Sequence, residues 1–194
     1  MRPLCRADVI AALIEISMTP LVTPVHIRPT LASDLLQVHE LHVRAFDGRN
    51  SEASLVTALH AANKALPSLV AIDEERIVGH IVFSAMAIDR PRKGLRVAGL
   101  GPVGVLPEYQ RRGIGSQLIL AGIDACRGAG IDAIAVLGEP RFYSRFGFRP
   151  GRHQGLANEY VQDDHFMVLE LRVGSLYEVT GLLRYAQEFK EAGC

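Results

Sequence analysis

Between residues 95 and 137 the chain has the pattern of an apolar strand, an amphipathic helix and a second apolar strand. The helix is expected over 113–128, because apolar residues recur there at spacings of four, three and four: Ile114, Leu118, Ala121 and Ala125. Gly130 ends it, and residues 131–137 then show no polar alternation after Asp132. A strand that is apolar on both faces is typical of a central position in a parallel pair. The order therefore predicts a layered fold built on a central sheet.

Further strands and helices are expected on both the N-terminal and the C-terminal side of this segment. Residues 25–28 alternate and predict a first strand, and Ser33 and Ser51 are positioned to cap helices that run to about residues 46 and 63. Further elements are expected as strands over 68–72 and 77–88 that form a hairpin, a strand over 95–106, a short helix over 140–146 and a late strand over 166–171. The fold class is therefore α/β, with a mixed central sheet and helices on both faces.

The composition argues against two classes of partner. The 194 residues include 21 Lys and Arg against 21 Asp and Glu, so the formal charge is zero. Because polyanion binding needs an excess of cations on one face, we expect no nucleic-acid partner. Aromatic residues make up 6% of the chain and Trp is absent, which argues against a surface that stacks on bases or sugars.

Cysteine usage and hydropathy limit the chain further. Cys5, Cys126 and Cys194 lie far apart and form no Cys-x-x-Cys pair, so neither a disulfide framework nor a metal site is predicted. No run of about 18 apolar residues indicates a membrane span, and we expect a cytoplasmic protein with no membrane partner. Residues 1–24 contain a second methionine, Met18, and precede the first regular pattern, so we interpret them as an N-terminal appendage.

Two glycine patterns lie close together and compete as ligand sites. Gly99-Leu100-Gly101-Pro102-Val103-Gly104 matches the formal G-x-G-x-x-G pattern of dinucleotide-binding folds. That motif must open a helix, whereas here it lies inside an apolar strand and is followed by Val105-Leu106-Pro107. We therefore interpret it as a strand with a bulge or splay, since Gly and Pro interrupt a β-ladder at such places. A nicotinamide-dependent oxidoreductase is the weaker alternative.

The second pattern is Gln110-Arg111-Arg112-Gly113-Ile114-Gly115-Ser116, where the strand gives way to the amphipathic helix. The first amides of a helix have no intrahelical partner, and the helix dipole adds partial positive charge. The two glycines leave the backbone accessible, the two arginines add full charges, and the serine adds a hydroxyl. Together these groups predict a site for a pyrophosphate-like anion. The alternative is an ordinary helix start with two solvated arginines.

The stretch Gly101–Ser116 resembles the acyl-CoA-binding motif of the GNAT superfamily of N-acetyltransferases, Q/R-x-x-G-x-G/A. The matching residues are Gln110, Gly113 and Gly115. Two later segments resemble the same family in the same order: Arg141–Phe148, after the fifth strand, and Phe166–Leu171, in a late strand. The resemblance is to a bacterial subgroup of largely unassigned substrate.

The resemblance covers about residues 25–173 and implies a GNAT domain there, with a C-terminal tail, residues 174–194, that packs on it. It also implies that the fourth and fifth strands splay apart and hold the pantetheine arm of acetyl-CoA. The implied pantetheine contacts are backbone groups of Val103, Gly104 and Val105. The implied pyrophosphate contacts form one run: Arg111, Arg112, Gly113, Ile114, Gly115 and Ser116. No metal is implied.

The implied activity is direct transfer of an acetyl group from acetyl-CoA to a small-molecule or peptide amine. Tyr143 matches the position of the general acid that protonates the departing thiolate. Residues 95–106 contain no acidic side chain, although many family members have a Glu there that acts as the general base. Glu52, Glu139 and His80 remain as weak candidates for the base.

The sequence leaves open the acceptor, the oligomeric state and the role of one basic turn. The acceptor is set by variable segments around residues 46–66 and 150–165. Pairing or exchange of the late strand would give a homodimer. Arg90-Pro91-Arg92-Lys93 would either contact a phosphate of the coenzyme or form a solvated turn. The alternative to an enzyme is a non-catalytic acyl-CoA-binding or sensor module, which would keep the anion site and lack transfer.

Overall fold

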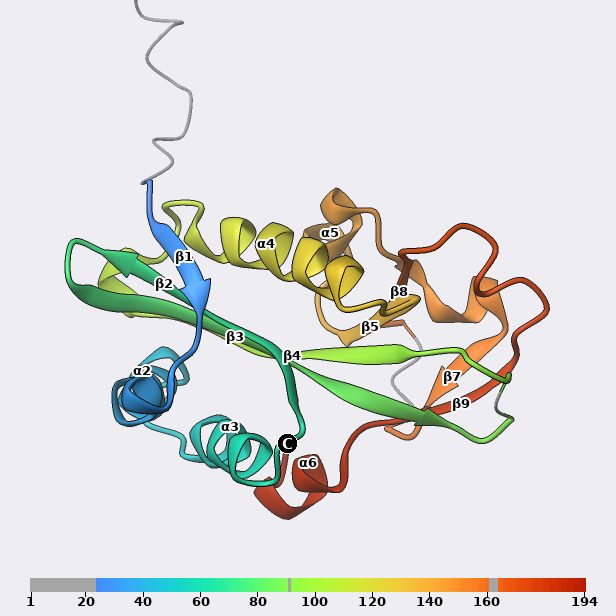
Figure 1. The fold of residues 1–194 in the computed structure, drawn as a ribbon, viewed down its shortest axis with the longest axis horizontal. Coiled ribbons are helices and arrows are strands. Elements are labelled where there is room, and N and C mark those ends of the chain that lie inside the picture. The colour runs from blue at the N-terminus through green and yellow to red at the C-terminus, as the bar shows by residue number, and fades with distance from the viewer. Residues whose placement is uncertain (1–23, 91, 161–163) are drawn as a thin grey trace, which may run out of the picture.

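The computed structural model describes residues 24–90, 92–160 and 164–194 (Figure 1). The strands are β1 (His26–Pro29), β2 (Ala65–Asp73), β3 (Arg76–Ile88), β4 (Val97–Val105), β5 (Ala133–Leu137), β6 (Arg149–Pro150), β7 (Leu156–Asn158), β8 (Phe166–Glu170) and β9 (Gly181–Arg184). The helices are α2 (Leu35–Ala45), α3 (Ser51–Ala61), α4 (Ile114–Gly128), α5 (Pro140–Tyr143) and α6 (Gln187–Ala192). The predicted N-terminal appendage, residues 1–24, lies outside the described residues except for Pro24.

The central sheet has the strand order β1-β2-β3-β4-β5-β8-β6. β4 and β5 pair in parallel and are joined through α4, whereas the other neighbours in this order are antiparallel. β9 pairs with the end of β3 and, in parallel, with β7. Helices α4 and α5 lie on one side of the sheet, and α2, α3 and α6 lie on the other (Figure 1). The predicted α/β class, with a mixed sheet and helices on both faces, is confirmed.

β4 and β5 separate soon after they pair. Their register ends where Gly99 lies opposite Ala135. Beyond that point β4 continues beside β3, with a register shift that contains Gly101 and Pro102. Gly101 has a φ of +145°, which glycine tolerates, and Pro102 has no amide hydrogen to donate to a neighbouring strand. The predicted bulge and the splayed fourth and fifth strands are confirmed.

Helix α4 packs closely on the sheet because one of its faces is apolar and contains a glycine. Leu118 and Ile119 are fully buried. A Cβ atom at Gly122 would lie 2.5 Å from the Phe83 ring on β3, so only glycine permits this approach. The amphipathic helix predicted for this segment is confirmed, and it begins at Ile114.

The start of α2 differs from the expectation. Ser33 does not cap the helix, because it lies inside a 3-10 turn, Ala32–Asp34, and α2 begins at Leu35. The Asp34 carboxylate accepts a hydrogen bond from the Leu31 amide at 2.7 Å and pairs with Arg28 at 2.6 Å. The acidic side chain at the end of the 3-10 turn therefore satisfies the Leu31 amide that precedes the turn.

The segment 174–194 is more structured than a tail. It contributes β9 to the sheet edge and α6 to the layer beside α3. Lys64 pairs with the mostly buried Glu188 at 2.8 Å and holds α6 against the start of β2. The boundary between a GNAT domain, residues 25–173, and this segment stays a prediction.

Candidate active site

The turn between β4 and α4 has an unusual backbone. Gly113 is the N-cap of α4 with a φ of 80°, and Arg111 has a φ of 59°, which is uncommon for a residue with a side chain. The Gln110 side chain donates from Nε2 to the carbonyl oxygen of Val105 at 3.0 Å, which ties the turn to the end of β4. Because a glycine cap has no side-chain acceptor, the first amides of α4 are available to a ligand.

A cavity of about 640 Å³ lies at this helix start. Val105, Ser116 and the intervening turn line one side of it, and Phe142 and Arg145 line another. The Arg112 guanidinium stacks 5.2 Å from the centre of the Tyr109 ring. The predicted residues Val105, Arg111, Arg112, Gly113, Ile114, Gly115 and Ser116 therefore line one cavity with positive charge on its wall.

Arg145 is a candidate phosphate-binding residue that the sequence reasoning missed. Its guanidinium carbon lies 4.6 Å from the centre of the Phe142 ring, and its Nε donates to the Phe142 carbonyl oxygen at 3.2 Å. These contacts hold the arginine at the cavity wall. Arg145 lies within the segment Arg141–Phe148 that resembles the family. No local sequence pattern predicts that this segment lies beside the start of α4.

Of the three predicted backbone contacts on β4, Val105 lines the cavity at α4, whereas Val103 and Gly104 are not among its lining residues. Gly101 and Pro102, earlier in β4, line a second cavity on the other side of the sheet. Gly104 pairs with His80 of β3, and a Cβ atom added to it would lie 3.0 Å from His42 Nδ1. A side chain at Gly104 would therefore point toward α2 instead of toward the cavity at α4.

Tyr143 is buried at the end of α5. Its ring packs against Gly138, and its centre lies 5.1 Å from that of Phe142 and 5.6 Å from that of Phe148. Burial raises the pKa of the Tyr143 phenol to about 12. The hydroxyl is therefore protonated at neutral pH and is a hydrogen-bond donor.

The three weak candidates for a base lie in different surroundings. His80 is fully buried and its ring nitrogens lie 2.8 Å from His42 Nε2 and 2.9 Å from Ser68 Oγ. Glu139 caps α5 by accepting from the Arg141 amide at 3.3 Å. Only Glu52 of the three lines the cavity beside Gly101 and Pro102.

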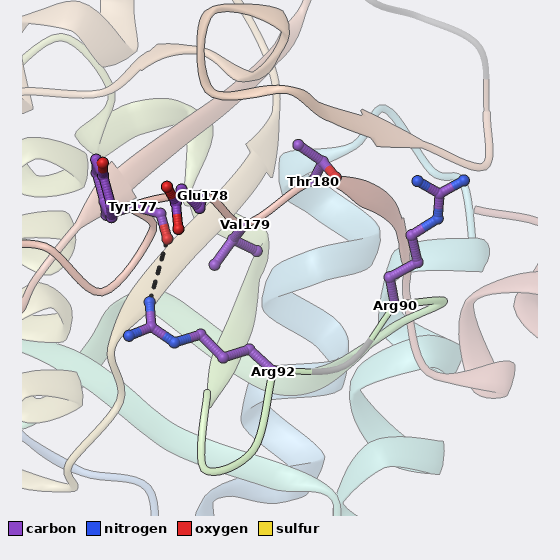
Figure 2. Close-up of a pocket in the computed structure, with 6 residues that line it drawn as sticks. All are labelled: Arg90, Arg92, Tyr177, Glu178, Val179 and Thr180. Atoms are coloured by element: carbon purple, nitrogen blue, oxygen red, sulfur yellow. Dashed lines mark hydrogen bonds between the residues drawn. The ribbon is translucent and has the colours of Figure 1, made fainter.

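The basic hairpin tip between β3 and β4 has a structural role. Arg92 donates to the carbonyl oxygens of Ser175 at 3.3 Å and Tyr177 at 3.2 Å, and Figure 2 shows it reaching toward this segment. β4 spans nine residues between this hairpin and the α4 turn, a separation of roughly 25 Å. The hairpin therefore anchors the C-terminal segment and lies at the opposite end of β4 from the cavity at the start of α4.

Among residues 24–90, 92–160 and 164–194, no group of three or more His, Cys, Asp and Glu side chains is arranged to hold a metal ion. Within the same part of the chain, no helix has the length and apolar character to cross a bilayer.

Comparison with known proteins identifies the family. Residues 26–151 match the family model of the acetyltransferase (GNAT) domain. The Escherichia coli K12 protein named uncharacterized N-acetyltransferase YhbS is 32% identical over 165 residues, which cover 84% of this chain and 97% of that protein.

Two solved structures show the same fold. The crystal structure of Escherichia coli YhbS in complex with CoA matches with a TM-score of 0.80 and 30% identity, over 86% of this chain and 92% of that one. A GNAT family acetyltransferase from Brucella melitensis in complex with acetyl-CoA matches with a TM-score of 0.71 and 33% identity, over 86% of this chain and 98% of that one. The resemblance seen in the sequence is thus confirmed: this chain belongs to the GNAT family of acetyltransferases.

Proposed function

We propose that the protein is an acetyl-CoA-dependent N-acetyltransferase that transfers the acetyl group directly to a primary amine. The observation that carries this proposal is the separation of β4 from β5 after Gly99, beside a helix start lined with cations. A thioester in that gap would meet unpaired strand edges while its diphosphate reached α4. The crystallised relatives from Escherichia coli and Brucella melitensis contain CoA and acetyl-CoA, which supports the same cosubstrate here.

The residues at the start of α4 fit the diphosphate of the coenzyme. The space beside Gly115 is open, since a Cβ atom there would meet only Val105 Cγ2, at 3.8 Å. The amides of Ile114, Gly115 and Ser116 would donate to phosphate oxygens. Arginine side chains on the same cavity wall would add charge-assisted hydrogen bonds: Arg111, Arg112 and Arg145. We assign the pantetheine arm to backbone groups of Val103, Gly104 and Val105.

The transfer step sets the role of Tyr143. The amine nitrogen forms a bond to the carbonyl carbon of the thioester as the carbon–sulfur bond breaks. The acceptor ammonium gives up two protons in the process, one to solvent and one to the departing sulfur. We assign the second transfer to the phenol of Tyr143, which would give its proton to the departing sulfur and take back the second proton of the acceptor nitrogen.

Calorimetry with CoA tests the binding half of the proposal. We expect heat of binding with the wild-type protein and none with Gly115→Glu, which would place a carboxylate in the phosphate cavity. Gly128→Glu is the matched control, because Gly128 lies at the other end of the same helix with no heavy atom within 4 Å of an added Cβ. Absence of binding to the wild type would overturn the proposal.

Release of the CoA thiol from acetyl-CoA tests the transfer half. An enzyme gives thiol release that depends on added amine. A protein that binds CoA and gives no amine-dependent release would instead be the non-catalytic acyl-CoA-binding module.

A further inference from the structure

A second cavity, of about 390 Å³, lies on the side of the sheet opposite α4. It lies between α3, the bulge of β4 at Gly101 and Pro102, the end of β5 at Leu137, and the C-terminal segment. The cavity therefore meets the sheet where β4 and β5 have already separated. A group that enters it from this side approaches the gap from the face opposite the diphosphate cavity.

Tyr185 closes the narrow end of the gap. Its ring packs on Gly99, the last residue of β4 that pairs with β5, and a Cβ atom at Gly99 would lie 2.6 Å from the ring atom Cε1. The Tyr185 hydroxyl is buried close to Leu137 at the end of β5, and burial raises the pKa of this phenol. The ring of this C-terminal residue thus forms the floor of the cavity between the two strands.

Beside Tyr185, two further aromatic rings and several aliphatic side chains line the cavity. The centre of the Tyr185 ring lies 5.9 Å from that of Tyr160 and 4.7 Å from that of Phe189. Leu55 of α3 lines the opposite side. The Tyr160 hydroxyl is buried and has no hydrogen-bond partner among the described residues. Such a wall buries an apolar ligand body and offers few polar contacts.

One acidic side chain, Glu52, lines the cavity among the described residues. Its side chain is only 15% exposed and accepts a hydrogen bond from Ser51 Oγ at 2.6 Å. Arg49 also lines the cavity and approaches Glu52 at 3.5 Å, with its side chain 65% exposed. Because Glu52 is mostly buried and is the acidic side chain of the cavity wall among the described residues, a ligand ammonium is favoured beside it.

We infer that this cavity binds the acetyl acceptor, and that the acceptor is a primary amine with one positive charge and an apolar body of aromatic size. The ammonium group lies against Glu52, and the apolar body lies against Tyr160, Tyr185 and Phe189. A polyamine would place further charges against an apolar wall. An amino acid would place a carboxylate beside Glu52, where it would compete with Glu52 for Arg49, the one cationic side chain that lines the cavity among the described residues. This assignment rests on the proposed acetyl transfer and names its acceptor class.

A panel of amines with acetyl-CoA tests the class. The readout is CoA thiol release, and the probes are 2-phenylethylamine, methylamine, L-phenylalanine and spermidine. Methylamine lacks the apolar body, L-phenylalanine adds a carboxylate, and spermidine adds positive charges. We expect kcat/KM for 2-phenylethylamine to exceed that of each other probe by tenfold or more. Equal or faster turnover of spermidine or L-phenylalanine overturns the inferred class.

Glu52→Gln tests the ammonium contact, with Glu75→Gln in the exposed β2–β3 turn as the matched control. We expect Glu52→Gln to raise KM for 2-phenylethylamine at least tenfold and to leave KM for acetyl-CoA unchanged. We expect the control to change neither. Unchanged KM for 2-phenylethylamine in Glu52→Gln overturns the contact.

Failure of the acceptor class is distinct from failure of the proposed function. If the protein binds CoA and acetylates a different amine best, the proposed function holds and the inferred acceptor class is wrong. If it binds CoA and acetylates no amine, both the proposed transfer and the inferred acceptor class are wrong. If calorimetry shows no CoA binding, both proposals are wrong.

Discussion

The Nε2 atom of His42 lies 2.8 Å from the Nδ1 atom of His80, and neither ring is accessible to solvent. The other nitrogen of His80 lies 2.9 Å from Ser68 Oγ. The two rings thus share one hydrogen bond inside the layer between α2 and the sheet. Burial is the main cause that lowers both pKa values, that of His42 to about 3 and that of His80 well below 6.5. Neighbouring imidazoles lower them further: that of His39 for His42, and those of His42 and His60 for His80.

This pair makes the fold sensitive to mild acid. The unfolded imidazoles bind protons near pH 6.5, whereas the folded ones do not, so the unfolded state binds more protons below that pH. The stabilisation is therefore complete above pH 6.5 and decreases as the pH falls toward 3. We expect the free energy of unfolding, measured with urea, to fall between pH 6.5 and 4.5 by up to about 1.4 kcal/mol per pH unit for each ring. A constant value over this range would contradict the prediction.

Two glycines of the candidate site should respond differently to alanine. A Cβ atom at Gly104 would lie 3.0 Å from His42 Nδ1 and 3.1 Å from Leu41 Cδ2, so alanine overpacks the layer beneath α2. We expect Gly104→Ala to destabilise the protein by roughly 1–3 kcal/mol. Gly115→Ala has open space around it and serves as the comparison, with no loss of stability expected. Thermal unfolding of both variants measures this difference in stability. Equal melting temperatures for the two variants would contradict the prediction.

The central part of the fold was predictable because its signals are local. The spacing of Ile114, Leu118, Ala121 and Ala125 predicts α4, and the combination of Gly101 with Pro102 predicts the interruption in β4. Each signal depends on residues close together in the sequence, and the tertiary contacts of these segments favour the same local structure. The resemblance to the GNAT family added the connection between these elements and an acyl-CoA site.

The C-terminal elements were not predictable, because they are short and are stabilised by contacts with distant residues. β9 has four residues and α6 has six, so neither shows a usable period. Both depend on distant partners, such as Asp89, whose carboxylate accepts from the Leu182 amide at 2.8 Å. For this reason the cavity beside Gly101 and Pro102 could not be predicted in full from the sequence, because Tyr185 and Phe189, which line it, come from this segment.

Removal of the Tyr143 hydroxyl should affect turnover alone. We expect Tyr143→Phe to lower kcat by about 10²–10⁴-fold, the usual contribution of a positioned acid, with KM for acetyl-CoA unchanged. Because burial raises the pKa of Tyr143 to about 12, the phenol stays protonated, and we expect no loss of activity from its ionisation below pH 10. Steady-state kinetics across pH 7–10 check both statements. An unaltered kcat in the variant would remove Tyr143 from the mechanism.

The Asp132 carboxylate connects residues that flank three strands of the sheet, β4, β5 and β8, and we expect this connection to weaken in acid. Its mostly buried carboxylate accepts from the Arg172 Nε at 2.7 Å and from the Arg96 amide at 2.8 Å. The hydrogen bond from Arg172, followed by that from Arg96, holds its pKa below the usual 3.8. We expect Asp132→Asn to cost about 1–3 kcal/mol of unfolding free energy at pH 7, since a charged acceptor is lost from two donors.

The same variant has a pH signature that an uncharged contact would lack. A carboxyl group with a lowered pKa stabilises the fold above its unfolded pKa, and this stabilisation is lost as the pH falls through the folded pKa. The difference between wild type and Asp132→Asn should therefore be constant from pH 7 to 5 and shrink below about pH 4. Asp124→Asn is the control: its pair with Arg127, at 2.8 Å, is exposed on α4. That variant should change the unfolding free energy by less than about 0.5 kcal/mol. A loss of similar size in both variants would show that burial of Asp132 gives its hydrogen bonds no advantage over a surface ion pair.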